Sequence, residues 1–323
     1  MTAPRSARHW AQIGECTSVW GIRFLLGIYR LFGRMPFTVV LGPVLLFYWL
    51  SNAGLRRASL TWLDRVNAAR PFCRGTPGTR EGLTHLMRFA ETILDKFLAS
   101  AGQLDPESLT VENGGIFHAD APDQGAVILT SHTGCQELLS AASAFSTTHP
   151  IVVLQHTAHA EKFNALLRKA ADAPAKLTFF EVSAITPATA MALSELSEKG
   201  AYIVIAGDRI PIGSEKATAV VPFFGHPAAF PTGGALLALL FHCPLRMMTA
   251  TRDGQKGRAP HYRVRFHSID EHPSAPRGKR DAWLENAVRL YAAELQSELA
   301  RSPYDWFNFF VFWKDEHHAQ KTV

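Results

Sequence analysis

Two patterns of apolar residues alternate along this chain. Four short runs are almost continuously apolar, as in strands that are buried on both faces of a parallel sheet. They lie at residues 125–130, 150–155, 176–181 and 201–206. Around them, apolar residues recur every three or four positions, which predicts helices over 138–145, 161–171, 187–198 and 230–242. Strands that alternate with helices predict an α/β fold: a mostly parallel sheet flanked by helices.

The same criteria predict further elements before residue 125 and after residue 242. A helix is predicted over 83–97, strands over 245–250 and 261–266, and a last helix over 281–301. The Gly-, Pro- and Arg-rich stretch 70–80 reads as a loop. We therefore expect two parts, an N-terminal helical segment at residues 1–70 and an α/β domain at 71–323, which the motifs below identify as the catalytic domain.

The N-terminal segment has the pattern of a membrane-associating element. Arg23 and Arg30 lie seven residues apart, on one helix face, with large apolar residues on the other, as in helices that lie in a membrane interface. The uncharged stretch 36–50 is shorter than the roughly 20 residues that a spanning helix needs. A re-entrant hairpin, a short tilted span and a buried core helix remain open; we expect attachment to the membrane surface.

Charge supports that expectation. Residues 1–80 contain eleven arginines, no lysine and two acids, whereas the remainder contains 22 basic and 26 acidic residues. A basic end suggests an anionic partner for that end alone. Because its arginines are embedded among large apolar residues, a membrane surface is favoured over nucleic acid.

Several kinds of site are not supported. The four cysteines form no zinc-type spacing, and the chain lacks GxSxG, GxxxxGK[ST], GxGxxG and HExxH motifs. We therefore expect no metal and no cofactor.

The first candidate site is SHTGCQE, which follows the predicted strand 125–130. A carboxylate on Glu137 could accept one imidazole N–H of His132 and leave the other nitrogen to take a proton from a hydroxyl. Two alternatives stay open: His132 is structural, or Cys135 is a nucleophile that forms a covalent intermediate.

The second candidate site follows the predicted strand 201–206. Arg209 is suited to a phosphate of the substrate, or else forms a salt bridge with Asp208 or Glu215. Other predicted substrate contacts have ordinary alternatives. Gly233 and Gly234 offer backbone N–H groups to an anion or simply begin a helix, and Phe223 and Phe224 line an acyl groove or belong to the core.

Together, His132-x4-Glu137, Asp208-Arg209 and the block PFFG…PTG at 222–233 resemble the lysophospholipid acyltransferase superfamily. The similarity is to the branch with the lipid A late acyltransferases, and more weakly to a subgroup linked to aryl-polyene lipid genes. The aromatic ending YDWFNFFVFW departs from the Trp- and Arg-rich ending of the lipid A enzymes, which leaves the acceptor open.

The resemblance implies fatty acyl transfer from a thioester on acyl carrier protein or coenzyme A. The acceptor would be a hydroxyl or amine of a lipid or glycolipid, at the cytoplasmic face of a bacterial inner membrane. A thioesterase and a non-catalytic membrane lipid-binding protein of the same fold are the alternatives.

Overall fold

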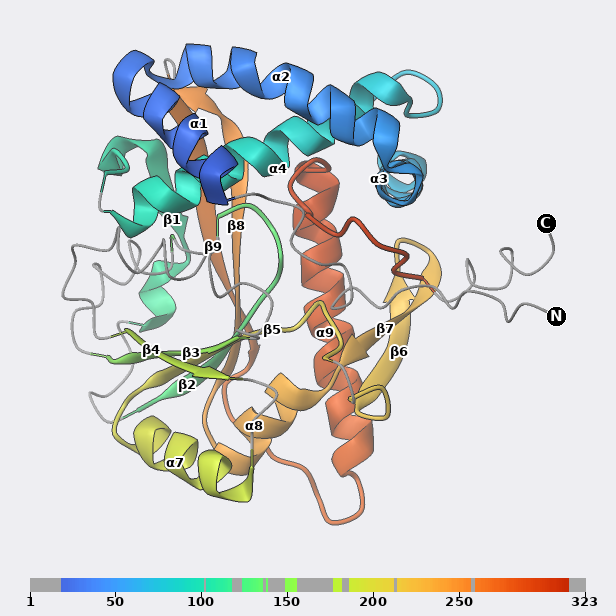
Figure 1. Ribbon diagram of the computed structural model, residues 1–323. Helices are drawn as coiled ribbons and strands as arrows, with labels where there is room; N and C mark the ends of the chain where they lie inside the picture. Colours follow the sequence, from blue (N-terminus) through green and yellow to red (C-terminus); the bar gives the residue numbers. More distant parts are fainter. Residues whose placement is uncertain are drawn as a thin grey trace, which may run out of the picture.

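The computed structural model of the protein describes residues 19–101, 103–117, 124–135, 138, 149–155, 177–181, 186–211, 214–256 and 259–313. At its centre lies a seven-stranded sheet with the order β1-β9-β8-β2-β5-β3-β4 (Figure 1). Every neighbouring pair is parallel except β8 and β9. The predicted α/β class with a mostly parallel, helix-flanked sheet is confirmed.

The four continuous apolar runs are the strands of one half of this sheet. They form β2 (Ala126–Thr130), β3 (Ile151–Gln155), β4 (Leu177–Glu181) and β5 (Tyr202–Ala206), each beginning one residue later than predicted. All five residues of β2 are buried, because neighbouring strands and helices cover both of its faces. Continuous hydrophobicity without alternation follows directly from this position.

The other half of the sheet differs from the prediction in length and direction. The strands β8 (Leu245–Lys256) and β9 (Ala259–Asp270) are twice as long as predicted and form an antiparallel pair. Polar residues near the ends of β8 and β9 interrupt the apolar runs, so the additional residues were not predicted to be strand. The short β1 (Leu109–Glu112) was not predicted and pairs with β9 at the edge.

A separate two-stranded sheet also escaped the prediction. It consists of β6 (Thr218–Phe223) and β7 (His226–Pro231), which are antiparallel. Because residues 230–231 belong to β7, the helix expected over 230–242 begins later, as α8 (Gly233–Phe241).

The predicted helices agree closely where the structure describes them. They are α4 (Thr79–Ser100), α7 (Pro187–Glu198) and α9 (Arg280–Arg301). The N-terminus of α7 is fixed by the side chain of Thr186, which accepts from the N–H of Thr189 at 3.2 Å, and by Pro187 at the first helical position. The helix predicted over 161–171 lies outside the described residues, as does all but one residue of that over 138–145.

The N-terminal part forms α1 (Val19–Phe32), α2 (Arg34–Ser51) and α3 (Ala53–Ala69). In Figure 1, α2 lies along α4 at the top of the molecule. Arg34 pairs with the buried Asp95 of α4, so this arginine is directed into the fold. One apolar face of α2 packs against α1 and α4, through Phe37, Leu41 and Leu45. Among the described helices, α2 alone is long and apolar enough to cross a membrane, judged by length and composition.

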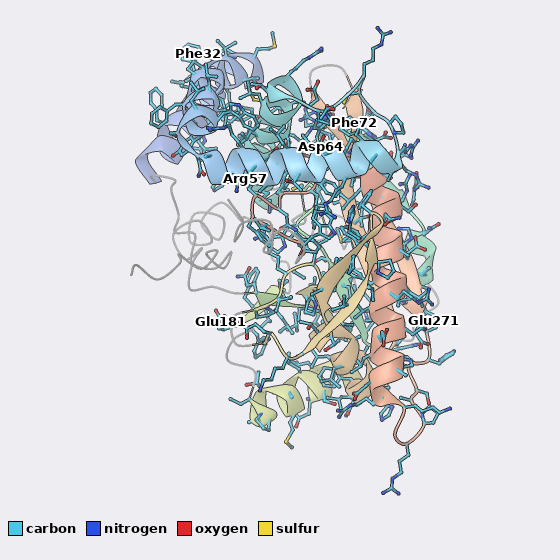
Figure 2. The ribbon with its side chains drawn as sticks, turned by 90° about the vertical axis from the view of Figure 1, so that its right-hand side faces the viewer. Phe32, Arg57, Asp64, Phe72, Glu181 and Glu271 are labelled. Carbon is cyan, nitrogen blue, oxygen red and sulfur yellow. The ribbon has the colours of Figure 1, made fainter. Side chains whose placement is uncertain are left out.

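Helix α3 belongs to the main core. Its residues Trp62, Leu63 and Val66 are completely or almost completely buried in the same cluster as the strands β2 and β5. Figure 2 shows α3 lying across the ends of α9 and the β6–β7 hairpin, with Arg57 and Phe72 near its two ends. Helix α3 therefore packs with the sheet, whereas α2 and part of α4 form a separate cluster; the boundary expected at residue 70 stays a prediction.

Trp62 of α3 also meets the last described segment of the chain. We call residues 303–313 the aromatic tail. The ring of Trp62 lies 4.5 Å from that of Trp306 between centroids, and 6.4 Å from that of Trp313, to which it is stacked. Its indole N–H donates to the carbonyl of Pro303 at 2.8 Å. The tail is thus packed into the core, where it reaches the carboxyl edge of the sheet.

Candidate active site

The candidate site lies at the carboxyl ends of β2 and β5, which are neighbours in the sheet. Their register pairs Thr130 with Ala206, and the N–H of Gly207 then donates to the carbonyl of Thr130 at 2.8 Å. His132 and Asp208 each come two residues after these paired positions. Since adjacent parallel strands end at the same edge, the register itself brings the two side chains together.

His132 and Asp208 form a pair with two contacts. The imidazole Nδ1 of His132 lies 2.8 Å from Oδ1 of Asp208, and the backbone N–H of His132 donates to Oδ2 at 2.9 Å. The side chain of Asp208 is 0% exposed, whereas that of His132 is 32% exposed. With Nδ1–H bound to the carboxylate, the ring is oriented and its Nε2 lone pair is available as a base.

Trp306 supplies a third hydrogen bond to Asp208. Its indole N–H donates to Oδ2 at 2.9 Å. The ring is fully buried, and its backbone carbonyl lies 2.9 Å from Nε2 of His85, which in turn meets Ser59 at 2.9 Å through Nδ1. A buried carboxylate needs such donors to stay charged. Sequence reasoning missed this role of Trp306; its only signal was the aromatic content of the tail.

Backbone contacts hold the loop after β2 against the aromatic tail. The N–H of Phe307 donates to the carbonyl of His132, and the N–H of Gly134 donates to the carbonyl of Asp305, both at 2.9 Å. Gly134 has a φ of +44°, and a side chain there would collide with the carbonyl oxygen of Ala250. Only glycine suits this position, which lets the loop pass close to β8.

The surroundings of His132 favour its neutral form. Burial is the main reason that the pKa of the His132 imidazole lies below its usual range, and the positive charge of Arg209 lowers it further. Burial alone would raise the pKa of Asp208, but the interactions with His132 and Arg209 outweigh it and lower the pKa to about 2. A neutral imidazole beside a charged carboxylate is the state that can accept a proton.

Arg209 contacts the aromatic tail. Its Nε donates to Oδ1 of Asn308 at 3.0 Å and its Nη2 to the carbonyl of Phe307 at 2.9 Å. The guanidinium carbon lies 5.7 Å from the centre of the Phe310 ring. Burial lowers the pKa of Arg209 to about 10, which leaves it charged at pH 7. These contacts use two of its three nitrogens and fix the tail, while the predicted contact of Arg209 with a phosphate stays a prediction.

Three other residues predicted to contact substrate, Asp208, Phe223 and Phe224, are buried in the structure. Asp208 is enclosed, and its oxygens serve His132 and Trp306. Phe223 and Phe224 are 0% and 5% exposed and pack with the tryptophans of the core, which corrects their assignment to an acyl groove.

The glycines before α8 divide into two kinds. Gly234 is buried, and a side chain there would collide with Leu129 of β2 and press on Ile205 of β5. Its role is therefore to let α8 approach the sheet, as the helix-start alternative proposed. Gly233 has open space around its α-carbon, so its predicted contact with an anion stays a prediction.

The two remaining candidate residues are Cys135 and Glu137. Cys135 is 0% exposed and packs in the core cluster that contains Met248 and Tyr262, a position that does not fit an accessible nucleophile. Glu137, the expected partner of His132, lies outside the described residues. The carboxylate placed on Nδ1 is that of Asp208, which sequence spacing alone did not pair with His132.

Within the described part of the chain, no three His, Cys, Asp or Glu side chains converge so as to hold a metal ion. A scan against models of known protein families finds no match to the sequence, and a comparison with curated proteins finds none either.

Proposed function

We propose that the protein is an acyltransferase. It moves a fatty acyl group from a thioester, carried by acyl carrier protein or coenzyme A, to a hydroxyl or amine of a lipid or glycolipid. The observation that carries the proposal is the pair formed by a partly exposed, neutral His132 and a fully buried Asp208. The order of the three sequence motifs, with their resemblance to the lysophospholipid acyltransferases, supports the choice of reaction.

The chemistry follows from the pair. Nε2 of His132 removes the proton of the acceptor hydroxyl while its oxygen forms a bond to the thioester carbonyl carbon. The carbon–sulfur bond then breaks, and the imidazolium returns its proton to the departing thiol. Asp208 stabilises the transient imidazolium through Nδ1–H. A thioester is already activated, so positioning and proton transfer are the main demands on the protein.

The N-terminal helices support a membrane location for this reaction. The face of α1 and α2 that points away from α4 carries large exposed apolar side chains, among them Leu31 (78% exposed), Phe47 (67%) and Leu50 (68%). Large apolar side chains that gather on an exposed surface often mark contact with a membrane or another protein. Because the other face of α2 is packed on α4, we propose that both helices lie in the membrane surface, at the cytoplasmic face of a bacterial inner membrane.

The first experiment measures transfer directly. The protein, purified in an uncharged maltoside detergent, is incubated with bacterial lipid extract and a donor that is radiolabelled in its acyl group, either acyl-acyl carrier protein or acyl-coenzyme A. We expect labelled lipid from the wild type, a loss of roughly 10²–10⁴-fold in His132→Ala, and normal rates in His272→Ala, an exposed histidine far along the chain. Free fatty acid as the main product would make the protein a thioesterase, and no turnover of either donor would refute catalysis.

The second experiment tests the membrane surface. We expect the wild type to sediment with anionic vesicles, and the double variant Leu31→Glu/Phe47→Glu to remain in the supernatant. The control is Met191→Glu, which alters an equally exposed apolar residue on α7. Equal sedimentation of all three proteins would contradict the proposed face. Release of the wild type by salt would identify attachment dominated by charge.

A further inference from the structure

A surface cleft of about 880 Å³ lies beside the candidate site, between α4 and the end of β8. Helix α4 crosses β8 in this region (Figure 1). The cleft is lined by Thr79, Arg80, Leu83, Thr84, Met87, Arg88, Glu91, Arg252 and Gly254. Arg252 pairs with Glu91 and Arg88 lies near Asp305, so the third arginine, Arg80, leaves this wall with a net positive charge, while the leucine and methionine make part of it apolar.

The arginines are arranged to receive an anion. Arg252 is 7% exposed and pairs with Glu91, yet its buried Nε has no hydrogen-bond acceptor among the described residues. A buried N–H donor normally has a hydrogen-bond acceptor, so the Nε–H of Arg252 is unusual. Arg88, on the same wall, lies 3.6 Å from Asp305 Oδ1 and is about one quarter exposed. The N-terminal turn of α4, with its positive dipole end, closes this wall.

Hydrogen bonds connect the cleft to the catalytic histidine. The backbone N–H of Arg252 donates to Oδ2 of Asp305 at 2.6 Å. The carbonyl of Asp305 accepts from the N–H of Gly134, two residues after His132. A molecule bound in the cleft therefore lies next to the loop that carries the base. The other side of α4 supports α2, whose outer face is apolar.

We infer that this cleft binds the phosphate of an amphiphilic molecule, with the phosphate at Arg88 and Arg252 and the attached chain against Leu83 and Met87. Planar guanidinium groups match phosphate oxygens in pairs, and the apolar wall suits an alkyl or acyl chain. As a place for a substrate phosphate, the inference rests on the proposed function. A lipid headgroup and the phosphopantetheine of the donor share this chemistry, so the experiment compares them.

Binding is measured without turnover, by calorimetry in an uncharged detergent, with three probes: dihexanoyl phosphatidic acid, coenzyme A and inorganic phosphate. We expect the first or the second to bind more tightly than phosphate alone, since phosphate alone cannot use the apolar wall. Arg88→Gln should weaken that binding about 10- to 100-fold, as expected for loss of one charged hydrogen bond. Arg289→Gln, an exposed arginine on α9, is the matched control and should bind normally.

A second variant distinguishes a loss of binding from a loss of folding. Thr84 is exposed on the cleft wall, and Thr84→Glu adds a carboxylate in a helix without removing any ion pair. We expect it to weaken binding as well, with an unchanged melting temperature. Failure of both dihexanoyl phosphatidic acid and coenzyme A to bind, or equal binding by all four proteins, would overturn the inference. If the wild type binds a probe through Arg88 but shows no transfer activity, the phosphate site is supported and the proposed function is refuted.

Discussion

Asp208→Asn is the sharpest test of the candidate site, because the shape of the side chain is kept and only its charge and one acceptor are lost. The two donors on Oδ2, the backbone N–H of His132 and the indole N–H of Trp306, force the amide oxygen of Asn to face them. The amide NH₂ then faces Nδ1 of the imidazole. Two N–H groups cannot bind each other, so the ring proton must move to Nε2.

The magnitude follows from this change of tautomer. With its proton on Nε2, the ring presents no lone pair to the acceptor hydroxyl, and general-base catalysis of roughly 10²–10⁴-fold is lost. The variant also loses the charge that stabilises the imidazolium and raises the pKa of His132, so that pKa falls further. We expect a loss of roughly 1.5–3 kcal/mol in the free energy of unfolding, since charged hydrogen bonds are removed from a buried group.

Three measurements check this expectation. Steady-state transfer rates should show the loss in kcat with little change in KM, since Asp208 does not contact substrate. NMR of the imidazole nitrogens should report protonated Nδ1 in the wild type and protonated Nε2 in Asp208→Asn. Asp281→Asn, which alters an exposed carboxylate, should match the wild type in both.

Glu137→Gln decides between the two acids. Nδ1 of His132 has room for one carboxylate, and Nε2 must face the acceptor. If Asp208 is the partner, Asp208→Asn loses far more activity than Glu137→Gln. The opposite order, with a nearly normal Asp208→Asn protein, would refute the assignment and restore the partner predicted from the spacing.

Three other changes have defined outcomes. Gly134→Ala should lower the free energy of unfolding by about 1–3 kcal/mol in urea, because of its positive φ and the collision with β8. Burial raises the pKa of Asp305 to about 6; its unfolded value is about 3.9, so the wild type loses stability as pH rises from 4 to 6. Asp305→Asn should therefore gain up to roughly 3 kcal/mol relative to the wild type between pH 4 and pH 7. Arg209→Met should shift the acid limb of kcat/KM to higher pH, since the cation that lowers the pKa of His132 is removed.

Each change has a control. Gly115→Ala, where a side chain meets open space, should unfold like the wild type. For Asp305, an unfolding difference that does not depend on pH would contradict the assignment. Arg209→Lys keeps the charge and should leave the acid limb in place; an equal shift in both variants would show that the tail contacts, not the charge, set the pKa of His132.

The local pattern of the sequence was enough to predict most helices and the buried parallel strands. Continuous apolar runs end where the strands end because both faces of β2 and β5 are covered. Strand β6 (TAVVPF) has only one polar residue, but its side chains alternate between buried and more exposed positions, and it was not predicted. The core position of Trp62 was also missed. Helix α3 is basic and apolar, and its sequence alone does not tell whether its apolar residues contact a membrane or the protein core.

The candidate site could be predicted only in part. His132 was found from its position after a strand, but its partner depends on the order of strands in the sheet. Chain order gives β2 and β3 as successive strands, whereas β5 lies between them in the sheet. The spacing of His132 and Asp208 in the sequence does not indicate that β2 and β5 are neighbours in the sheet. The contribution of Trp306, 98 residues after Asp208, is beyond any local pattern.

The contact between the aromatic tail and the loop after β2 has a consequence for biosynthesis. Trp306 is made after every strand of the sheet, and yet its indole N–H is one of the donors that keep Asp208 charged. A chain still leaving the ribosome can fold its strands around β2, but Asp208 then lacks this donor and His132 lacks the backbone contact with Phe307. The contacts of the proposed base are therefore completed last, and we expect a nascent or incompletely folded chain to lack the proposed activity.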